Sequence, residues 1–364
     1  MNLYPFLFRP NLHTVVWGGH QLQPYKGLPP TDDPIGESWE VSAVPSSTSI
    51  ISNGPLAGRD LISVVTESPD AILGHAVNEK YKGQLPLLVK FIDAQRDLSI
   101  QVHPNDEMAQ REHGKMGKSE MWYVIKATPD AHLYAGFKQH IDAEEYRRRI
   151  ADGTITEVLA DHRVKAGDVF YLPAGRVHAI CGGILLAEVQ QSSDVTYRIY
   201  DYNRPGLDGK PRELHTELAA QALDYEVERN YRTDYPQLDN RAVLIVDSPY
   251  FSVRVLEFND RFHRNLLKYD SFIITMCIEG DCEIRLRPTV TSHCNATLSK
   301  KELSIVNSQL SIVLTAGNST LIPASIADYD LIPLHGKSRI LDAFIDNRPT
   351  TLPQQITQLL HIER

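Results

Sequence analysis

The sequence has 364 residues, of which 42% are hydrophobic and 23% charged, a composition typical of a globular protein with a substantial core. Asp and Glu outnumber Lys and Arg by 46 to 37, so the net charge is −9, which argues against nucleic-acid binding. The chain contains no apolar run of about 18 residues, so we expect no membrane-spanning segment.

The N-terminal region and the cysteines indicate a reducing compartment. Residues 1–19 lack the basic segment and apolar core that form a signal peptide. No CxxC pair is present, which favours free thiols at the four cysteines, Cys181, Cys277, Cys282 and Cys294. We therefore predict a cytoplasmic protein.

Strand patterns dominate the chain. Runs rich in Val, Ile, Leu, Tyr and Phe alternate with Gly, Pro, Asn and Asp, which is typical of β-strands between turns. In chain order the predicted strands are 61–65, 86–93, 98–103, 120–125, 168–173, 183–191 and 194–202. Helical patterns cover 142–153, which begins with an Asp cap, and also 212–225 and 352–363. We predict a mainly β fold, an antiparallel barrel or sandwich with helical insertions.

A short internal repeat suggests two related β domains. The segment "KAGDVFYLPAGRVHAI" (165–180) aligns with "TAGNSTLIPASIADYD" (315–330), and chance similarity is the alternative explanation. The first copy has His178 where the second has Asp328, so we expect the second domain to lack a metal. The polar segment 231–241 is the predicted boundary, which gives domains of residues 1–235 and 236–364.

Two polar residues share one face of a predicted strand. In "LSIQVHPND" (98–106) side chains alternate along an extended chain, so Gln101 and His103 point the same way. On a solvent-exposed face, or as satisfied residues lining a barrel, they would need no functional explanation. Inside a barrel they supply two neutral metal ligands side by side.

Two further segments can complete a metal site. Glu120 begins a strand after a Gly-Lys turn, and His178 follows a Pro-Ala-Gly turn that folds the chain back. A set with two histidines, one amide and one carboxylate favours Zn²⁺, with Mn²⁺, Fe²⁺ or Co²⁺ as competitors. A mixed set without cysteine is typical of a catalytic site with an open position.

These segments resemble a known family. The chain is similar to type I mannose-6-phosphate isomerases of the short bacterial kind, which are zinc enzymes of the cupin superfamily. The matching segments run in family order, and they are "VVWGG" (15–19), "GESWEVS" (36–42), "LSIQVHPND" (98–106), "GKSEMWYVI" (117–125), "GDVFYLPAGRVHAI" (167–180) and "TYRIYDY" (196–202). Beyond about residue 240 no family motif is recognisable.

The resemblance implies a fold, a cofactor and site residues. The implied fold has two cupin-type jelly-roll β-barrels with a small helical segment. One Zn²⁺ per chain would be bound by Gln101, His103, Glu120 and His178. Lys118 and Arg198 would face the substrate as catalytic and binding residues. The "GKSE" turn differs from the Lys-Pro-Glu of longer family members, which leaves the placement of Lys118 open.

The predicted function is the interconversion of mannose 6-phosphate and fructose 6-phosphate. Isomerisation moves a proton between C1 and C2, and a divalent cation can stabilise the oxygen that becomes partly anionic. Candidates for the base are Lys118, whose proton a nearby metal would make easier to release, and Glu188. A guanidinium such as Arg198 can bind phosphate bidentately, with help from Arg176 or Lys118. Alternatively, Arg198 has only a structural role and forms an ion pair with Asp201 or Glu188.

Two other functions fit the same residues. One is a cupin isomerase that acts on another sugar or sugar phosphate, and the other is a non-catalytic cupin that binds sugar phosphates. The expected partner is a small sugar phosphate, with no nucleic acid and no membrane, and we expect a monomer or a weak homodimer.

Overall fold

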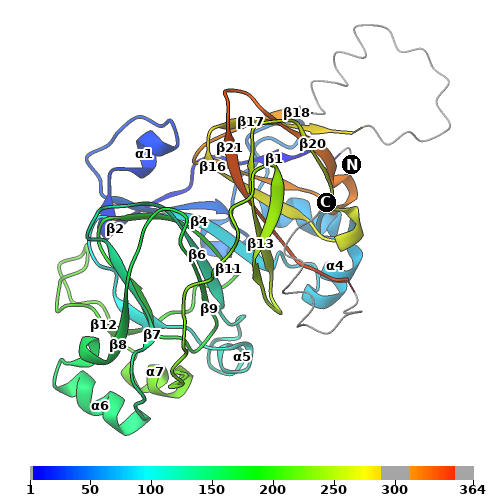
Figure 1. Cartoon of the computed structure of the whole chain (residues 1–364). Coiled ribbons are helices and arrows are strands. Elements are labelled where there is room, and N and C mark those ends of the chain that lie inside the picture. Colours follow the sequence, from blue (N-terminus) through cyan, green and yellow to red (C-terminus); the bar gives the residue numbers. More distant parts are fainter. Residues whose placement is uncertain (1–2, 288–310, 349–364) are drawn as a thin grey trace, which may run out of the picture. The chain divides into compact units, whose positions relative to one another are not determined.

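The computed structural model describes residues 3–287 and 311–348, which form two compact units (Figure 1). The first unit comprises residues 10–47 and 86–234. The second comprises residues 48–85 together with the described residues of 1–9 and 235–364. The predicted division into 1–235 and 236–364 assumed continuous domains. In the structure, two N-terminal segments, the described residues of 1–9 and residues 48–85, group with the C-terminal part of the chain. The assignment of functions to those two domains stays a prediction.

Two antiparallel sheets build the first unit. The six-stranded sheet has the order β2 (Leu12–Gly19), β3 (Ile35–Val41), β4 (Leu87–Ala94), β11 (Ile184–Gln191), β6 (Glu120–Ala127), β9 (Val169–Leu172). The five-stranded sheet has the order β12 (Tyr197–Tyr200), β5 (Ile100–Val102), β10 (His178–Ile180), β7 (His132–Phe137), β8 (Leu159–Arg163). Both orders are linear, so neither sheet closes on itself among the described residues.

The core of the first unit lies between its two sheets. Ile92, Trp122 and Leu186 from one sheet join Leu133 and Ile180 from the other in a single buried cluster. All eight residues of β4 and of β11 are buried, because these strands occupy the middle of their sheet. Polar side chains on the inner faces are therefore held in an apolar surrounding, where they need partners.

Short helices complete the first unit. They are α1 (Leu22–Tyr25), η1 (Pro45–Ser47), α5 (Asp106–His113), α6 (Ala143–Ala151), η2 (Ile155–Val158) and α7 (Thr216–Ala222). The helix predicted at 142–153 is α6, and the Asp142 carboxylate caps it by accepting from the Glu145 N–H at 2.7 Å. The helix predicted at 212–225 is present only over α7. The one predicted at 352–363 lies outside the described residues.

The second unit has the same kind of architecture. Its six-stranded sheet has the order β1 (Phe6–Leu7), β19 (Ser319–Ile322), β16 (Ile273–Glu279), β21 (Ser338–Phe344), β14 (Ser252–Phe258), β13 (Arg241–Asp247). A four-stranded sheet has the order β15 (Phe262–Asn265), β20 (Asp328–Pro333), β17 (Asp281–Leu286), β18 (Ser311–Thr315). The helices are α2 (Leu61–Glu67), α3 (Pro69–Leu73), α4 (His75–Tyr81), η3 (Leu267–Tyr269) and η4 (Ala324–Ile326).

The prediction of a strand at 61–65 is wrong, because this segment lies in helix α2. The Asp60 carboxylate accepts from the Ser63 N–H at 2.9 Å and caps the helix. The buried side chains Leu61, Val64 and Val65 follow the i, i+3, i+4 spacing of one helical face. The β-branched content of the run masked this spacing. The wider prediction of a mainly β chain with antiparallel sheets is confirmed.

The two copies of the sequence repeat have similar local structure. Each has a glycine with positive φ, Gly167 at 90° and Gly317 at 79°, followed by a short strand and a Pro-Ala turn. They differ at the aligned position. His178 is buried inside the first unit, whereas Asp328 is half-exposed and pairs with His263 at 2.7 Å.

Candidate metal centre

Three strands of the five-stranded sheet place polar side chains in one row. Gln101 on β5 lies directly opposite His178 on β10 and, on its other side, opposite Arg198 on β12. Residues directly opposite in antiparallel strands project from the same face. His103, one residue past β5, shares that face by strand alternation. Glu120 approaches this row from the first position of β6 in the facing sheet.

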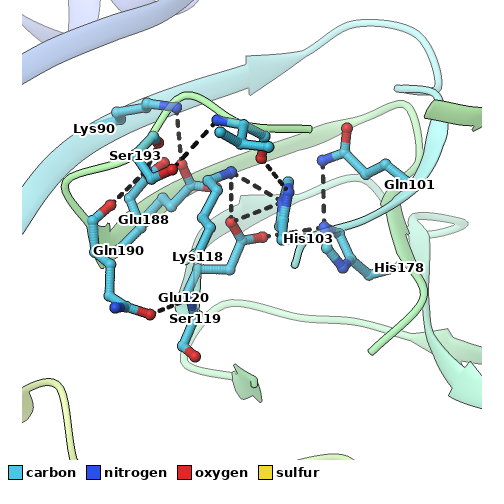
Figure 2. A network of polar contacts seen from close by, with 12 residues as sticks. Lys90, Gln101, His103, Lys118, Ser119, Glu120, His178, Glu188, Gln190 and Ser193 are labelled. Atoms are coloured by element: carbon cyan, nitrogen blue, oxygen red, sulfur yellow. Dashed lines mark hydrogen bonds and ion pairs between the residues drawn. The ribbon is translucent and has the colours of Figure 1, made fainter. Parts of the chain in front are cut away.

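The side chains of His103, Glu120 and His178 converge (Figure 2). The Nε2 atom of His103 lies 3.3 Å from Glu120 Oε2, and the Nε2 atom of His178 lies 3.3 Å from Glu120 Oε1. These three residues are at most 2% exposed, so water does not solvate them. Their potential ligand atoms all lie within 4.8 Å of one another. Beside them, the Gln101 amide nitrogen is 3.3 Å from His178 Nε2.

Backbone carbonyls set the tautomer of both imidazoles. His103 Nδ1–H donates to the Val195 carbonyl at 2.9 Å, and His178 Nδ1–H donates to the Arg176 carbonyl at 2.8 Å. A carbonyl only accepts, so in the neutral ring Nε2 carries a lone pair. Burial lowers the pKa of His103 to about 3 and also lowers the pKa of His178, so both rings are neutral at pH 7.

The carboxylate of Glu120 is only partly satisfied. Burial would raise the pKa of Glu120, but the Lys118 ammonium holds it well below its usual range. Lys118 Nζ lies 2.8 Å from Oε2 and 3.0 Å from His103 Nε2. Oε1 has no hydrogen-bond donor in the described part of the chain and faces the lone pair of His178 Nε2. A cation at this position would satisfy both atoms, so the residues present fit a metal ion.

A second buried cluster lies beside this one on the six-stranded sheet. Strand register aligns Lys90, Glu188 and Trp122 in one row. Glu188 lies 3.2 Å from Lys90 Nζ and accepts from the Trp122 indole N–H at 3.0 Å. Burial raises the pKa of Glu188, and the carboxylates of Glu188 and Glu37 raise the pKa of Lys90 despite its burial. The cluster can therefore hold or release a proton at a site shielded from water.

Comparisons with known proteins show the family of this chain. A family model described as phosphomannose isomerase type I, catalytic domain, matches residues 6–124. The mannose-6-phosphate isomerase ManA of Bacillus subtilis is 35% identical over 77% of this chain and 87% of its own length. The mannose-6-phosphate isomerase of Streptococcus mutans is 36% identical over 68% of this chain and 77% of its own length. This chain belongs to the type I phosphomannose isomerase family.

Solved structures of this family share the fold of the chain. A structure of the mannose 6-phosphate isomerase from Bacillus subtilis has a TM-score of 0.78 at 28% identity, covering 94% of this chain and 99% of its own. A structure of the Salmonella typhimurium phosphomannose isomerase, solved as a single-residue variant, has a TM-score of 0.71 at 16% identity, which shows the fold alone. It covers 94% of this chain and 100% of its own. The prediction that the chain is an isomerase of this family is confirmed. Among the described residues, no helix is long and apolar enough to cross a membrane.

The structure of this type I isomerase does not bring the Arg176 side chain to the metal cluster. Its guanidinium pairs with Glu228, donates to the Tyr171 carbonyl at 2.9 Å and stacks over the Tyr231 ring. The backbone carbonyl of Arg176 accepts from His178 Nδ1–H, and the Arg176 charge adds to burial in lowering the pKa of His178. The suggestion that Arg176 assists phosphate binding therefore lacks structural support.

Arg198 keeps free donor capacity. Its Nη1 donates to the Glu213 carbonyl at 2.8 Å, while its buried Nε has no hydrogen-bond partner among the described residues. Burial and the neighbouring guanidiniums of Arg212 and Arg204 lower its pKa. The Asp201 carboxylate, the alternative structural partner, is instead bound by Arg204 and Arg212. Arg198 therefore has one buried donor without a partner among the described residues, on a strand position opposite Gln101.

Sequence reasoning missed Lys90 and Trp122 as site residues. Lys90 stands alone in the apolar run 86–93, and its strand parity matches that of Ile92, which faces the core between the sheets. A lysine at such a position has to be paired, which is the signal that was available. Trp122 was missed because the acceptor of its indole N–H, Glu188, lies on another strand, and pairing between strands is not visible in one sequence.

Proposed function

We propose that this isomerase interconverts mannose 6-phosphate and fructose 6-phosphate at one divalent metal site in the first unit. The observation that carries the proposal is the donorless Oε1 of Glu120 facing a neutral imidazole in a dry cluster. The relatives are named as mannose-6-phosphate isomerases, which suggests the substrate. The cluster offers a place for a cation that can stabilise the oxygen that becomes anionic during aldose–ketose isomerisation.

We propose Zn²⁺ as that metal, held by Gln101, His103, Glu120 and His178. Two imidazoles and one carboxylate are borderline ligands that zinc prefers, and no cysteine is near among the described residues. Gln101 now points its amide nitrogen at His178, and an amide flip would present its oxygen instead. The backbone carbonyls that accept from Nδ1 hold both imidazoles with Nε2 directed inward, as outer partners of metal ligands do.

The chain's own side chains divide the remaining work. A metal held by these residues would supply positive charge for the oxygen on C1 or C2 that becomes partly anionic. Lys118 and Glu188 are both buried next to the cluster, so either can move the proton between these carbons. Arg198 holds the phosphate through its guanidinium, whose Nε is free of other partners among the described residues. Trp122 and Lys90 fix the carboxylate of Glu188.

The wider architecture of the proposal follows from the family. Each unit would be a cupin-type jelly roll, the first catalytic and the second without metal. The enzyme would act in the cytoplasm on a free sugar phosphate, as a monomer or a weak homodimer. Conversion of another sugar phosphate by the same residues is the alternative that the experiment below separates.

The test combines a coupled assay with proton exchange. Purified protein loaded with Zn²⁺ should convert mannose 6-phosphate to fructose 6-phosphate and incorporate solvent deuterium into the substrate at C2. Glucose 6-phosphate is the competing substrate, and Lys118→Met is the control for catalysis. Binding of mannose 6-phosphate without conversion or exchange would identify a sugar-phosphate-binding protein and refute the proposal.

A further inference from the structure

The turn that carries Lys118 and Glu120 is held by groups outside the cluster. Lys118 and Glu120 alternate with Ser119, so their side chains point into the site while Ser119 points away. Ser119 is 1% exposed, and its hydroxyl accepts from the Ala174 N–H at 3.1 Å. The Lys118 N–H donates to the Pro104 carbonyl at 3.0 Å. The position of this peptide therefore sets the positions of two site residues.

Gln191 binds both backbone polar groups of Ser119, the N–H and the carbonyl. Its backbone N–H donates to the Ser119 carbonyl at 3.0 Å, and its side-chain oxygen accepts from the Ser119 N–H at 2.8 Å. Gln191 is 4% exposed and ends β11, the strand that also carries Glu188. Each of the two peptide groups that flank the Ser119 Cα is bound by Gln191, so neither can rotate without breaking a buried hydrogen bond.

Asp106 connects the same turn to the segment of the histidine ligand. Its Oδ1 accepts from the Gln191 side-chain amide at 3.0 Å and from the Gly117 N–H at 2.8 Å. Asp106 lies three residues after His103 and begins α5. The turn packs closely there, since a Cβ on Gly117 would lie 2.5 Å from the Asp106 nitrogen. Asp106 and Gln191 thus connect three parts of the chain: the segment of His103, the turn with Lys118 and Glu120, and the end of β11, which carries Glu188.

We propose that Gln191 and Asp106 are positioning residues that set Lys118 and Glu120 against His103. The inference rests on the proposed function and deepens it, because neither residue touches the cluster itself. The amide of Gln191 is required as such, since it accepts from the Ser119 N–H with its oxygen and donates to Asp106 with its nitrogen. A carboxylate at position 191 can still accept from that N–H but repels Asp106.

The experiment replaces the Gln191 amide, which donates to Asp106, by a carboxylate, and then replaces the Asp106 carboxylate by an amide. Gln191→Glu should weaken zinc binding by about tenfold or more, as loss of outer partners of metal ligands does. It should lower kcat by about 10- to 100-fold at saturating zinc and substrate, because the reacting groups are displaced. The double variant Gln191→Glu/Asp106→Asn removes the charge repulsion and should recover part of both losses, because one amide atom cannot both accept from the Gly117 N–H and donate to the carboxylate at position 191. Gln110→Glu, an exposed change on α5 with the same charge, is the matched control and should change neither quantity.

Three measurements decide the outcome. They are the zinc affinity by competition with a chromogenic chelator, kcat and KM on mannose 6-phosphate, and the melting temperature of each variant. Wild-type zinc affinity and kcat in Gln191→Glu would overturn the inference, as would a loss that Asp106→Asn does not recover. If Gln191→Glu does not fold, Asp106→Ala at the exposed end of the link should show the same losses in smaller degree, and unchanged values there would also refute it.

The zinc measurement separates this inference from the proposed function. A wild-type protein that binds zinc but does not isomerise mannose 6-phosphate would refute the function. In that case the zinc affinities of the variants would still decide whether the link positions Glu120.

Discussion

Each of the two units buries an acidic residue in its interior, and the two carboxylates are satisfied differently. Asp342 in the second unit accepts from the Arg264 guanidinium at 2.8 Å on Oδ2 and from the Thr275 hydroxyl at 2.7 Å on Oδ1. Glu120 in the first unit has the Lys118 ammonium beside Oε2, but Oε1 faces only a lone pair among the described residues. Both acidic residues are at most 1% exposed.

The difference separates a structural network from a ligand site. Leaving a buried charged oxygen without a donor costs roughly 1–3 kcal/mol or more, so a fold retains one where something else supplies the positive charge. Both carboxylate oxygens of Asp342 have donors without a ligand, so this residue should contribute to stability alone. The cluster around Glu120 is complete only with a cation and should contribute to metal binding and catalysis.

The largest expected effect comes from removing a histidine of the cluster. His103→Ala and His178→Ala should each abolish metal binding and lower activity by about 10³-fold or more, since the charge stabilisation at the reacting oxygen is lost. Both variants should keep the far-UV circular dichroism of the wild type, because the incomplete cluster contributes little to folding. Retained turnover in a variant shown to be metal-free would contradict the comparison.

The second prediction concerns the buried ion pair of Asp342 and Arg264 in the second unit. Asp342→Ala leaves Arg264 buried without its counterion and should lower the free energy of unfolding by about 3–5 kcal/mol. Zinc content and kcat of the folded variant should stay at wild-type values, because no residue of the cluster is changed. Urea unfolding monitored by circular dichroism gives the stability. Loss of zinc in a variant that remains folded would show that the two networks are not independent.

Substitution of Arg198 should have an intermediate effect that depends on the phosphate. Loss of a charge-assisted contact of about 1.5–3 kcal/mol lowers kcat/KM by roughly tenfold to a few hundredfold. Arg198→Ala should show this loss with mannose 6-phosphate but not with mannose, and Arg198→Lys should recover part of it, since an ammonium keeps the charge without the fork. Zinc content should not change. Equal losses with both sugars would reassign Arg198 to the sugar or to the barrel wall.

The smallest expected effect is a pH dependence of the metal-free protein. Burial lowers the pKa of His103 to about 3 in the folded state, whereas an unfolded histidine titrates near 6.5. The unfolded chain therefore binds a proton that the folded chain refuses, and stability is lost as the pH falls below about 6.5. With chelator present, the wild type should lose more stability between about pH 7 and pH 5 than His103→Gln does. Equal losses would show that the buried imidazole is not held neutral.

From the sequence we predicted that Gln101, His103, Glu120 and His178 lie together, and the structure groups the last three in one buried cluster that could hold a metal ion. The surroundings of this cluster were not predicted. Gln101 and His103 were placed on one face by strand alternation, and family order brought in Glu120 and His178. Lys90 was not predicted as a site residue because its partner, Glu188 on β11, lies far away in the sequence. Pairing between strands is not visible in one sequence. The side chain of Arg176 was expected near the site, but its guanidinium is occupied by Glu228.

The fold was predicted at the level of strands rather than of units. Apolar runs between turn residues identified six strands of the first unit, namely β4, β5, β6, β9, β11 and β12. Residues 61–65 formed a helix because capping by Asp60 outweighed β-branched content. The grouping of residues 48–85 with the C-terminal part depends on long-range packing, which local patterns do not encode.

Titration of the chelator-stripped protein with zinc tests the central claim most directly. Wild-type protein and Glu120→Gln are compared by competition with a chromogenic chelator, and bound metal is counted by elemental analysis. We predict one equivalent of zinc per chain in the wild type and none at the same free zinc concentration in Glu120→Gln. Equal zinc binding by the two proteins, or a second equivalent that survives the substitution, would contradict the assignment of the metal to this cluster.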